Sequence, residues 1–240
     1  MKALKRTVAF LLVLSMVLIS GCGREEEVVN PNVAAWENAQ DLLAAKDYKA
    51  AAEVFESLGG YEEAPLLTIY SRAMQALKEG KYESAYLSFE KLDGYLDSRF
   101  AASYAKALYE KENGKAEPEK YLSAAEIFDG IPLYKDSEAL AGEARKSLYN
   151  TAESCLKAGD FENAYNYFEM LADYSDSTQM TFYVVACYHE AKGAQDTKSY
   201  LMAVEKFEDL NGFRDSAARA EKVLENTYAY ALKADRKSVV

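Results

Sequence analysis

The stretch that decides the fold is "GDFENAYNYFEMLADYSDS", residues 159–177. Its second half returns three more times, as "FEKLDGYLDS" at 89–98, "FDGIPLYKDS" at 128–137 and "FEDLNGFRDS" at 207–216. When the chain is aligned on the first Phe of these strings, Phe168 in the quoted stretch, a fifth unit appears at Phe55. Recurrence at a near-constant spacing indicates one supersecondary unit that is copied along the chain.

Each unit carries an apolar stripe with the spacing of a helix. An Ala lies four residues before the aligned Phe, a Tyr or Phe seven before, and a Leu or Ile three after. These offsets place all four positions within about 80° on a helix, which predicts one buried face. The aligned residues are Phe55, Phe89, Phe128, Phe168 and Phe207.

In each unit another helix is predicted before the helix that carries the aligned Phe. In four units a Gly ends the helical pattern, at Gly80, Gly114, Gly159 and Gly193, and Lys46 takes this place in the first unit. An aromatic residue lies ten positions before that stop, and an Ala lies three positions after the aromatic residue. We call these aromatics the aromatic ladder: Trp36, Tyr70, Tyr104, Tyr149 and Tyr183. Each unit is therefore predicted to be helix A, a turn and helix B.

The spacing of the units is 34, 39, 40 and 39 residues. Units 3 and 5 carry five extra residues between the stop Gly and helix B, and unit 4 carries six between Asp136 and Tyr149. Without these additions the period is 34 throughout. After the fifth unit, residues 215–238 repeat the pattern of a helix A alone, which predicts a capping helix over the last apolar face.

A 34-residue helical pair with small and aromatic anchors resembles the tetratricopeptide repeat, or TPR. "GDFENAYNYF" at 159–168 and "GKYESAYLSF" at 80–89 are similar to that family's turn and second helix. The resemblance spans residues 33–235 and leaves 236–240 as a tail. It implies an all-α, right-handed superhelical solenoid of five TPR-like helix pairs plus a C-terminal capping helix. The family's closing Pro is replaced here by Tyr/Phe-x-Asp-Ser, and the Gly of helix A by Ala.

The Tyr/Phe-x-Asp-Ser string is predicted to be the joint between units. Asp97 and its counterparts can cap the next helix, because an Asp side chain accepts from free backbone N–H groups at a helix start. The aromatic of each string is expected to fill the gap between units. A catalytic role for these Asp residues is the alternative, but one Asp per unit is what a structural joint needs.

The N-terminal segment has the pattern of a signal peptide. Lys2, Lys5 and Arg6 precede an apolar run, residues 8–19, that is short for a membrane span of roughly 20 residues. "ISGC" at 19–22 resembles the lipobox of bacterial lipoproteins, which implies cleavage after residue 21 and lipidation of Cys22. Two or more acyl chains anchor a protein stably. An uncleaved signal anchor and ordinary secretion are the alternatives. Residues 22–32 then form the lipidated end and a short tether.

Composition limits the chemistry. The formal net charge is -11, and it becomes -14 without the three basic residues of segment 1–21, so nucleic acid and anionic lipid surfaces are not expected partners. Three cysteines imply no disulfide framework, although a Cys155–Cys187 disulfide is an alternative to two reduced residues. His189 is the only histidine. We expect no metal, no cofactor and no catalytic residue, and hence no enzyme.

The expected function is a membrane-anchored scaffold or adaptor of the cell envelope. Stacked helix pairs offer a concave face that binds extended peptides or other proteins. The alternative is a receptor-like lipoprotein that captures a small solute or glycan, since clustered Tyr residues suit sugar stacking. For the aromatic ladder two interpretations stay open: it borders the binding groove, or it packs between helices A and B.

Overall fold

The computed structural model describes residues 30–193 and 196–238, and within these ranges the protein is entirely helical. The bounds of the helices are α1 (Pro31–Ala44), α2 (Tyr48–Ser57), α3 (Ala64–Lys78), α4 (Tyr82–Glu90), α5 (Ser98–Asn113), α6 (Glu119–Asp129), α7 (Ser137–Ala158), α8 (Phe161–Leu171), α9 (Ser177–Gly193), α10 (Thr197–Asp209) and α11 (Ser216–Ser238). Odd-numbered helices up to α9 are the predicted A helices, even-numbered ones are the B helices, and α11 follows the last pair.

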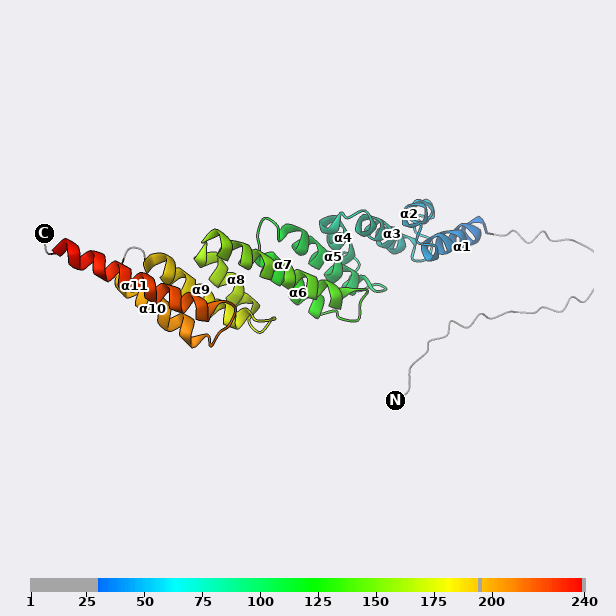
Figure 1. Ribbon diagram of the computed structural model, residues 1–240. Helices are drawn as coiled ribbons and strands as arrows, with labels where there is room; N and C mark the ends of the chain where they lie inside the picture. Colours follow the sequence, from blue (N-terminus) through cyan, green and yellow to red (C-terminus); the bar gives the residue numbers. More distant parts are fainter. Residues whose placement is uncertain (1–29, 194–195, 239–240) are drawn as a thin grey trace, which may run out of the picture.

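The helices form an elongated array with α1 at one end and α11 at the other (Figure 1). Each helix packs against the helix before it and the helix after it, and α6 also touches α8. Because nearly all of these contacts join neighbours in the sequence, the arrangement is that of a helical solenoid.

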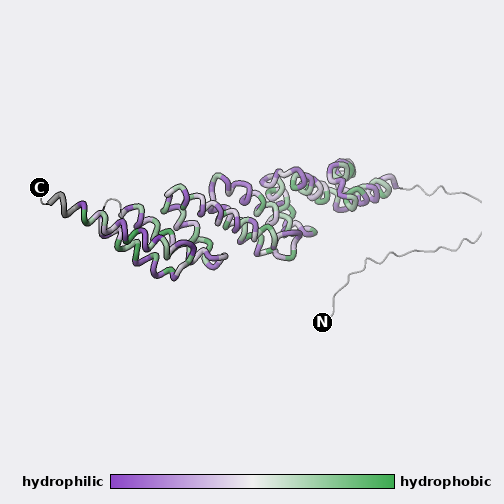
Figure 2. The backbone as a smooth tube through the Cα atoms, in the orientation of Figure 1, coloured by the Kyte–Doolittle hydropathy of each residue, from purple (hydrophilic) through white to green (hydrophobic). Residues whose placement is uncertain are grey.

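The core is a row of phenylalanines on the B helices. Phe55, Phe128, Phe168 and Phe207 are 0% exposed and Phe89 is 1% exposed, and the Ala four residues before each of them is fully buried. Hydrophobic and hydrophilic residues accordingly alternate along the helices in Figure 2. Burying a Phe side chain contributes roughly 1.5–3 kcal/mol, and the small Ala lets the neighbouring helix approach.

The joint between units has one backbone geometry. The residue before each Asp of Tyr/Phe-x-Asp-Ser adopts a left-handed conformation, with φ of 54°, 51°, 56° and 53° at Leu96, Lys135, Ser175 and Arg214. The next A helix then begins at the Ser of the string: Ser98, Ser137, Ser177 and Ser216. A left-handed residue reverses the chain abruptly, so the string makes a compact turn from helix B into helix A.

The stop glycines have two different roles. Gly80 and Gly159 have φ of 75° and 79°, and Lys46 holds the same left-handed conformation with φ of 61°. Gly114 has an ordinary helical φ of -56°, but a Cβ atom there would lie 2.5 Å from the ring of Tyr121. In unit 3, where five extra residues follow the stop, glycine is therefore needed because the Tyr121 ring lies close to it, and not because the turn is left-handed.

The additions and the chain ends account for the other differences in helix length. The six extra residues of unit 4 extend α7 to 22 residues, whereas α3, α5 and α9 have 15 to 17. The first helix begins at Pro31 and the last ends at Ser238, slightly outside the expected limits of 33 and 235. Pro31 suits the first turn because its missing N–H would have no partner there. Segment 1–21 and Cys22 lie outside the described residues.

Candidate functional site

The aromatic ladder packs against the core. Every ladder ring makes an edge-to-face contact with the aligned Phe of its own unit, with ring centroids 5.2 to 5.9 Å apart. Tyr104 and Tyr183 are buried, with 8% and 6% exposure, while Trp36, Tyr70 and Tyr149 are half-buried. The rings therefore lie between helices A and B, as the second of the two interpretations expects.

The tyrosine hydroxyls of the ladder reach the next unit. Tyr70 donates to Asp97 over 2.7 Å and Tyr104 donates to Asp136 over 2.6 Å. The same bond joins Tyr149 to Asp176 and Tyr183 to Asp215. Asp97 also accepts from the joint residue Tyr134 over 2.8 Å, through its other carboxylate oxygen.

These bonds correct the expected role of the joint aspartates. Asp97 and Asp136 stand at the N-cap positions of α5 and α7, but neither side chain makes a capping hydrogen bond. The carboxylates instead accept the tyrosine hydroxyls of neighbouring units. The joint is thus held by a side-chain bond between units, in addition to the packing of its aromatic residue.

The environment keeps these tyrosines protonated. Burial, followed by the hydrogen bond to the carboxylate, raises the pKa of Tyr149 and of Tyr183 to about 12. The same two causes raise the pKa of Tyr70, Tyr104 and Tyr134. At neutral pH every one of these hydroxyls is available as a donor.

A groove crosses three successive A helices in the first half of the array. We call it the N-terminal groove, and its volume is about 480 Å³. Its floor is mainly apolar and aromatic, with Met74 and Leu77 from α3, Tyr104 and Leu108 from α5, and Leu140 from α7. Tyr48, Tyr82 and Asp136 complete the wall.

Three lysines line the same groove: Lys46, Lys78 and Lys135. None of them forms an ion pair with any residue that the structure describes. The ammonium group of Lys135 lies 4.7 Å from the ring centroid of Tyr104 and 5.3 Å from that of Tyr134. These neighbours exclude water from the ammonium group and lower its pKa, although the residue as a whole is exposed.

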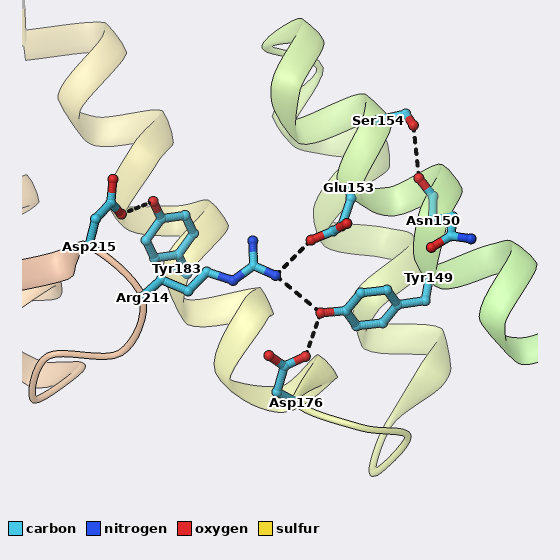
Figure 3. Close-up of polar contacts among 8 residues, drawn as sticks. All are labelled: Tyr149, Asn150, Glu153, Ser154, Asp176, Tyr183, Arg214 and Asp215. Atoms are coloured by element: carbon cyan, nitrogen blue, oxygen red, sulfur yellow. Dashed lines mark hydrogen bonds and ion pairs between the residues drawn. The ribbon is translucent and has the colours of Figure 1, made fainter.

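A second groove, the C-terminal groove, lies between α7, α9 and the start of α11. It has a volume of about 490 Å³ and is lined by residues that include Glu153, Leu156, Tyr183, Arg214 and Arg219. Arg214 donates to Glu153 over 2.6 Å and to the hydroxyl of Tyr149 over 3.3 Å (Figure 3). Both arginines of this groove thus have a carboxylate partner, because Arg219 donates to Glu190 over 2.7 Å.

The ladder is not gathered into one site. Tyr104 lines the N-terminal groove and Tyr183 the C-terminal groove, whereas Trp36, Tyr70 and Tyr149 line neither. Sequence reasoning missed the three lysines of the N-terminal groove. A signal existed for two of them, since Lys46 fills the place of a stop Gly and Lys135 is the variable residue of a joint string.

The described residues offer little other chemistry. Cys155 and Cys187 are free thiols, and burial raises the pKa of Cys187 to about 11, which keeps it protonated. No group of three or more metal-ligating side chains occurs in ranges 30–193 and 196–233. No helix of the described part is long and apolar enough to cross a membrane.

Comparison with known proteins adds no identification. No family model matches the chain, and no curated protein matches it.

Proposed function

We propose that this protein is a membrane-anchored scaffold or adaptor of the bacterial cell envelope, a right-handed TPR-like superhelix that binds a protein or peptide partner. The partner would lie along the A helices, in the N-terminal groove. The lipid on Cys22 would be the anchor, and no cofactor is needed.

The N-terminal groove is the observation that supports this proposal. It combines an apolar floor from three A helices with three lysines that form no ion pair within the described part of the chain. A peptide with aliphatic side chains and negative charge would bury the apolar floor and neutralise the lysines. A groove that crosses several repeat units also suits an extended chain better than a compact one.

A receptor for a small solute or glycan is the second candidate. The groove volume of about 480 Å³ lies within the usual range for small-molecule sites, roughly 300–1,000 Å³. Tyr82, which is half-buried in its wall, would provide a stacking surface.

Site-specific photocrosslinking in living cells separates the two candidates. A photoreactive amino acid at Leu108, in the groove floor, should join the protein to one dominant polypeptide identified by mass spectrometry. The same residue at Leu87, which is 44% exposed on α4, is the matched control and should capture that polypeptide far less. No polypeptide at Leu108, together with a small molecule that copurifies, would support the receptor instead.

The anchor has its own test. Cys22→Ser removes the thiol that lipidation requires, so we expect the variant to be released from membranes or mislocalised. If the variant is processed normally and still sediments with membranes after a high-salt wash, the lipoprotein assignment is wrong.

A further inference from the structure

A row of large apolar side chains is exposed along one edge of the first three units. We call it the joint edge, because it is formed by the joint strings and by the first turns of the A helices. Its exposed apolar residues are Val33, Leu66, Leu96, Phe100 and Leu133. Leu133 is 99% exposed, Leu96 59% and Phe100 53%. These side chains line neither the N-terminal nor the C-terminal groove, so a peptide in either groove leaves them uncovered.

Contacts between successive joints make this edge continuous. Tyr95 of the second joint donates a hydrogen bond to Glu63 of the first joint. Tyr134 of the third joint donates to Asp97 of the second over 2.8 Å. The ring of Phe100 stacks on that of Tyr134, with 6.0 Å between centroids. The exposed apolar side chains therefore belong to one surface that runs across three units.

The turn itself does not require apolar residues at these places, as the later units show. Leu66 and Phe100 are the third residues of α3 and α5, and the third residues of the later A helices are small or polar: Ala139, Gln179 and Ala218. The residues equivalent to Leu96 are charged or polar: Lys135, Ser175 and Arg214. The residue equivalent to Leu133 is Asp173 after unit 4. Because the same turn forms with these residues, the apolar side chains of the first three units are available for a contact outside the chain.

The first helix begins at the same edge, and the residues before it lead to the proposed lipid anchor. Trp36 in α1 packs edge-to-face on Tyr61 of the first joint, with 5.9 Å between ring centroids. Cys22 lies eight residues before Asn30, the N-cap of α1. Eight residues span at most about 29 Å. A lipid on Cys22 would therefore hold the start of the joint edge close to a bilayer.

We propose that the joint edge of the first three units rests on the bilayer that holds the anchor, with Leu96, Phe100 and Leu133 among the headgroups and upper acyl chains. This inference rests on the anchor of the proposed function and adds the orientation of the anchored array. A few side chains bind a bilayer weakly, as a single acyl chain does, so the release expected for Cys22→Ser is unchanged.

The chemistry of the edge suits a lipid surface without net charge. Apolar side chains of interfacial segments reach about 5–10 Å into the boundary between headgroups and acyl chains. Each of the three joints also carries a half-buried tyrosine, and tyrosine is enriched at headgroup level because its ring is apolar and its hydroxyl is polar. The edge carries Arg99 and Lys135 as well as Glu62 and Asp93. The contact therefore depends on apolar side chains and does not need anionic headgroups.

Quenching of tryptophan fluorescence by brominated lipid measures this contact. The mature, lipidated protein is reconstituted into phosphatidylcholine vesicles whose acyl chains carry bromine close to the headgroup. Leu133→Trp places a reporter on the edge, and Asp173→Trp, at the equivalent position after unit 4, is the matched control. The wild-type protein gives the background of Trp36, its only tryptophan. We expect quenching at least about threefold stronger for Leu133→Trp than for the control, because only the first reporter reaches the acyl boundary.

Charged substitutions test whether the apolar side chains make the contact. Leu96→Asp, Phe100→Asp in the Leu133→Trp protein should remove most of the quenching. Ser175→Asp, Gln179→Asp adds the same charges at the equivalent positions after unit 4 and should leave the quenching unchanged. Thermal unfolding verifies that these variants fold. Leu96→Asp alone is the second variant, because Asp tolerates the left-handed backbone at this position.

The inference is overturned if the two reporters of the lipidated protein are quenched equally, or if quenching survives the charged substitutions in a folded variant. It is also overturned if a photoreactive amino acid at Leu133 captures a polypeptide in cells while the vesicles show no quenching, since a protein would then cover the edge. Failures of the proposed function have other readouts. A purified protein whose mass shows no acyl chains would reject the anchor and the orientation together, whereas no polypeptide at Leu108 would reject the scaffold alone.

Discussion

The hydroxyl group of Tyr104 on α5 donates a hydrogen bond of 2.6 Å to the carboxylate of Asp136, the residue before α7. The ring of the same tyrosine packs edge-to-face on Phe128 of α6, with 5.8 Å between centroids. One side chain thus joins its own helix, its partner helix and the next unit. Because the bond recurs along the array, it explains why an aromatic in helix A and an Asp in the joint repeat together.

We expect Tyr104→Phe to lower the free energy of unfolding by about 1–2 kcal/mol, since it removes a hydrogen bond to a charged group but keeps the ring. Chemical denaturation measures this loss. Tyr228→Phe is the control, because Tyr228 is 67% exposed; it should change stability by less than about 0.5 kcal/mol. Equal effects of the two variants would show that the bond to Asp136 contributes nothing.

Alkaline pH should loosen the array. The pKa of Tyr149 and of Tyr183 is about 12 in the folded protein, against a normal value of 10.0. Below pH 10 both folded and unfolded chains hold these protons, so the stabilisation is complete. Between pH 10 and about 12 only the unfolded chain loses them, and stability therefore falls as pH rises.

Denaturation at a series of pH values, with tyrosinate absorbance as a second readout, measures this fall. The Tyr149→Phe, Tyr183→Phe double variant should be less stable than the wild type at neutral pH and should lose less stability over the alkaline range. An unchanged pH slope in the double variant would mean that other groups cause the loss.

Replacing Gly114 and Gly142 by Ala should change stability in opposite directions. Gly114→Ala should destabilise by about 1–3 kcal/mol, because the new Cβ would lie 2.5 Å from the Tyr121 ring. Gly142→Ala should stabilise the protein by about 0.5–1 kcal/mol. Gly142 lies within α7, and a Cβ atom added there would have nothing within 4 Å. Thermal midpoints that move in the same direction would contradict this account of Gly114.

Helical periodicity predicted the elements well, and the reason is physical. The spacing of Phe, Ala and Leu or Ile reflects burial on one helix face, and the structure confirms these positions as core except Leu210, which is half-buried. The stop glycines were placed correctly, but the reason for Gly114 was not visible, since it depends on where the Tyr121 ring folds back after an insertion. The joint aspartates were misjudged because a local rule for helix caps competes with a hydroxyl that lies 27 or 32 residues away.

Stability should also depend on position in the array. Phe55 and Phe168 are both 0% exposed, and truncating a buried Phe costs roughly 3–5 kcal/mol. We expect Phe168→Ala to lower the thermal midpoint much more than Phe55→Ala, because Phe168 has units on both sides while the first unit can fray alone. A larger shift for Phe55→Ala would contradict this dependence on neighbours.

The grooves could not be predicted from the sequence in the same way. Lys46 lies in the turn of unit 1, Lys78 at the end of helix A of unit 2 and Lys135 in the joint after unit 3, so no period connects them. Only the stacking of successive helices brings them to one cavity. The ladder was easier to find because it repeats, but that repetition reflects its place in the core.

The most direct test of the account is capture of the partner by a protein that lacks the charge of the N-terminal groove. The triple variant Lys46→Gln, Lys78→Gln, Lys135→Gln removes this charge. Affinity purification of this variant from cells should no longer recover the polypeptide that crosslinks to Leu108, and its thermal midpoint should be nearly unchanged. The control Lys91→Gln, Lys115→Gln, Lys222→Gln alters three exposed lysines that line neither groove, and it should retain the polypeptide. Undiminished capture by the groove variant would contradict the claim that this groove holds the partner.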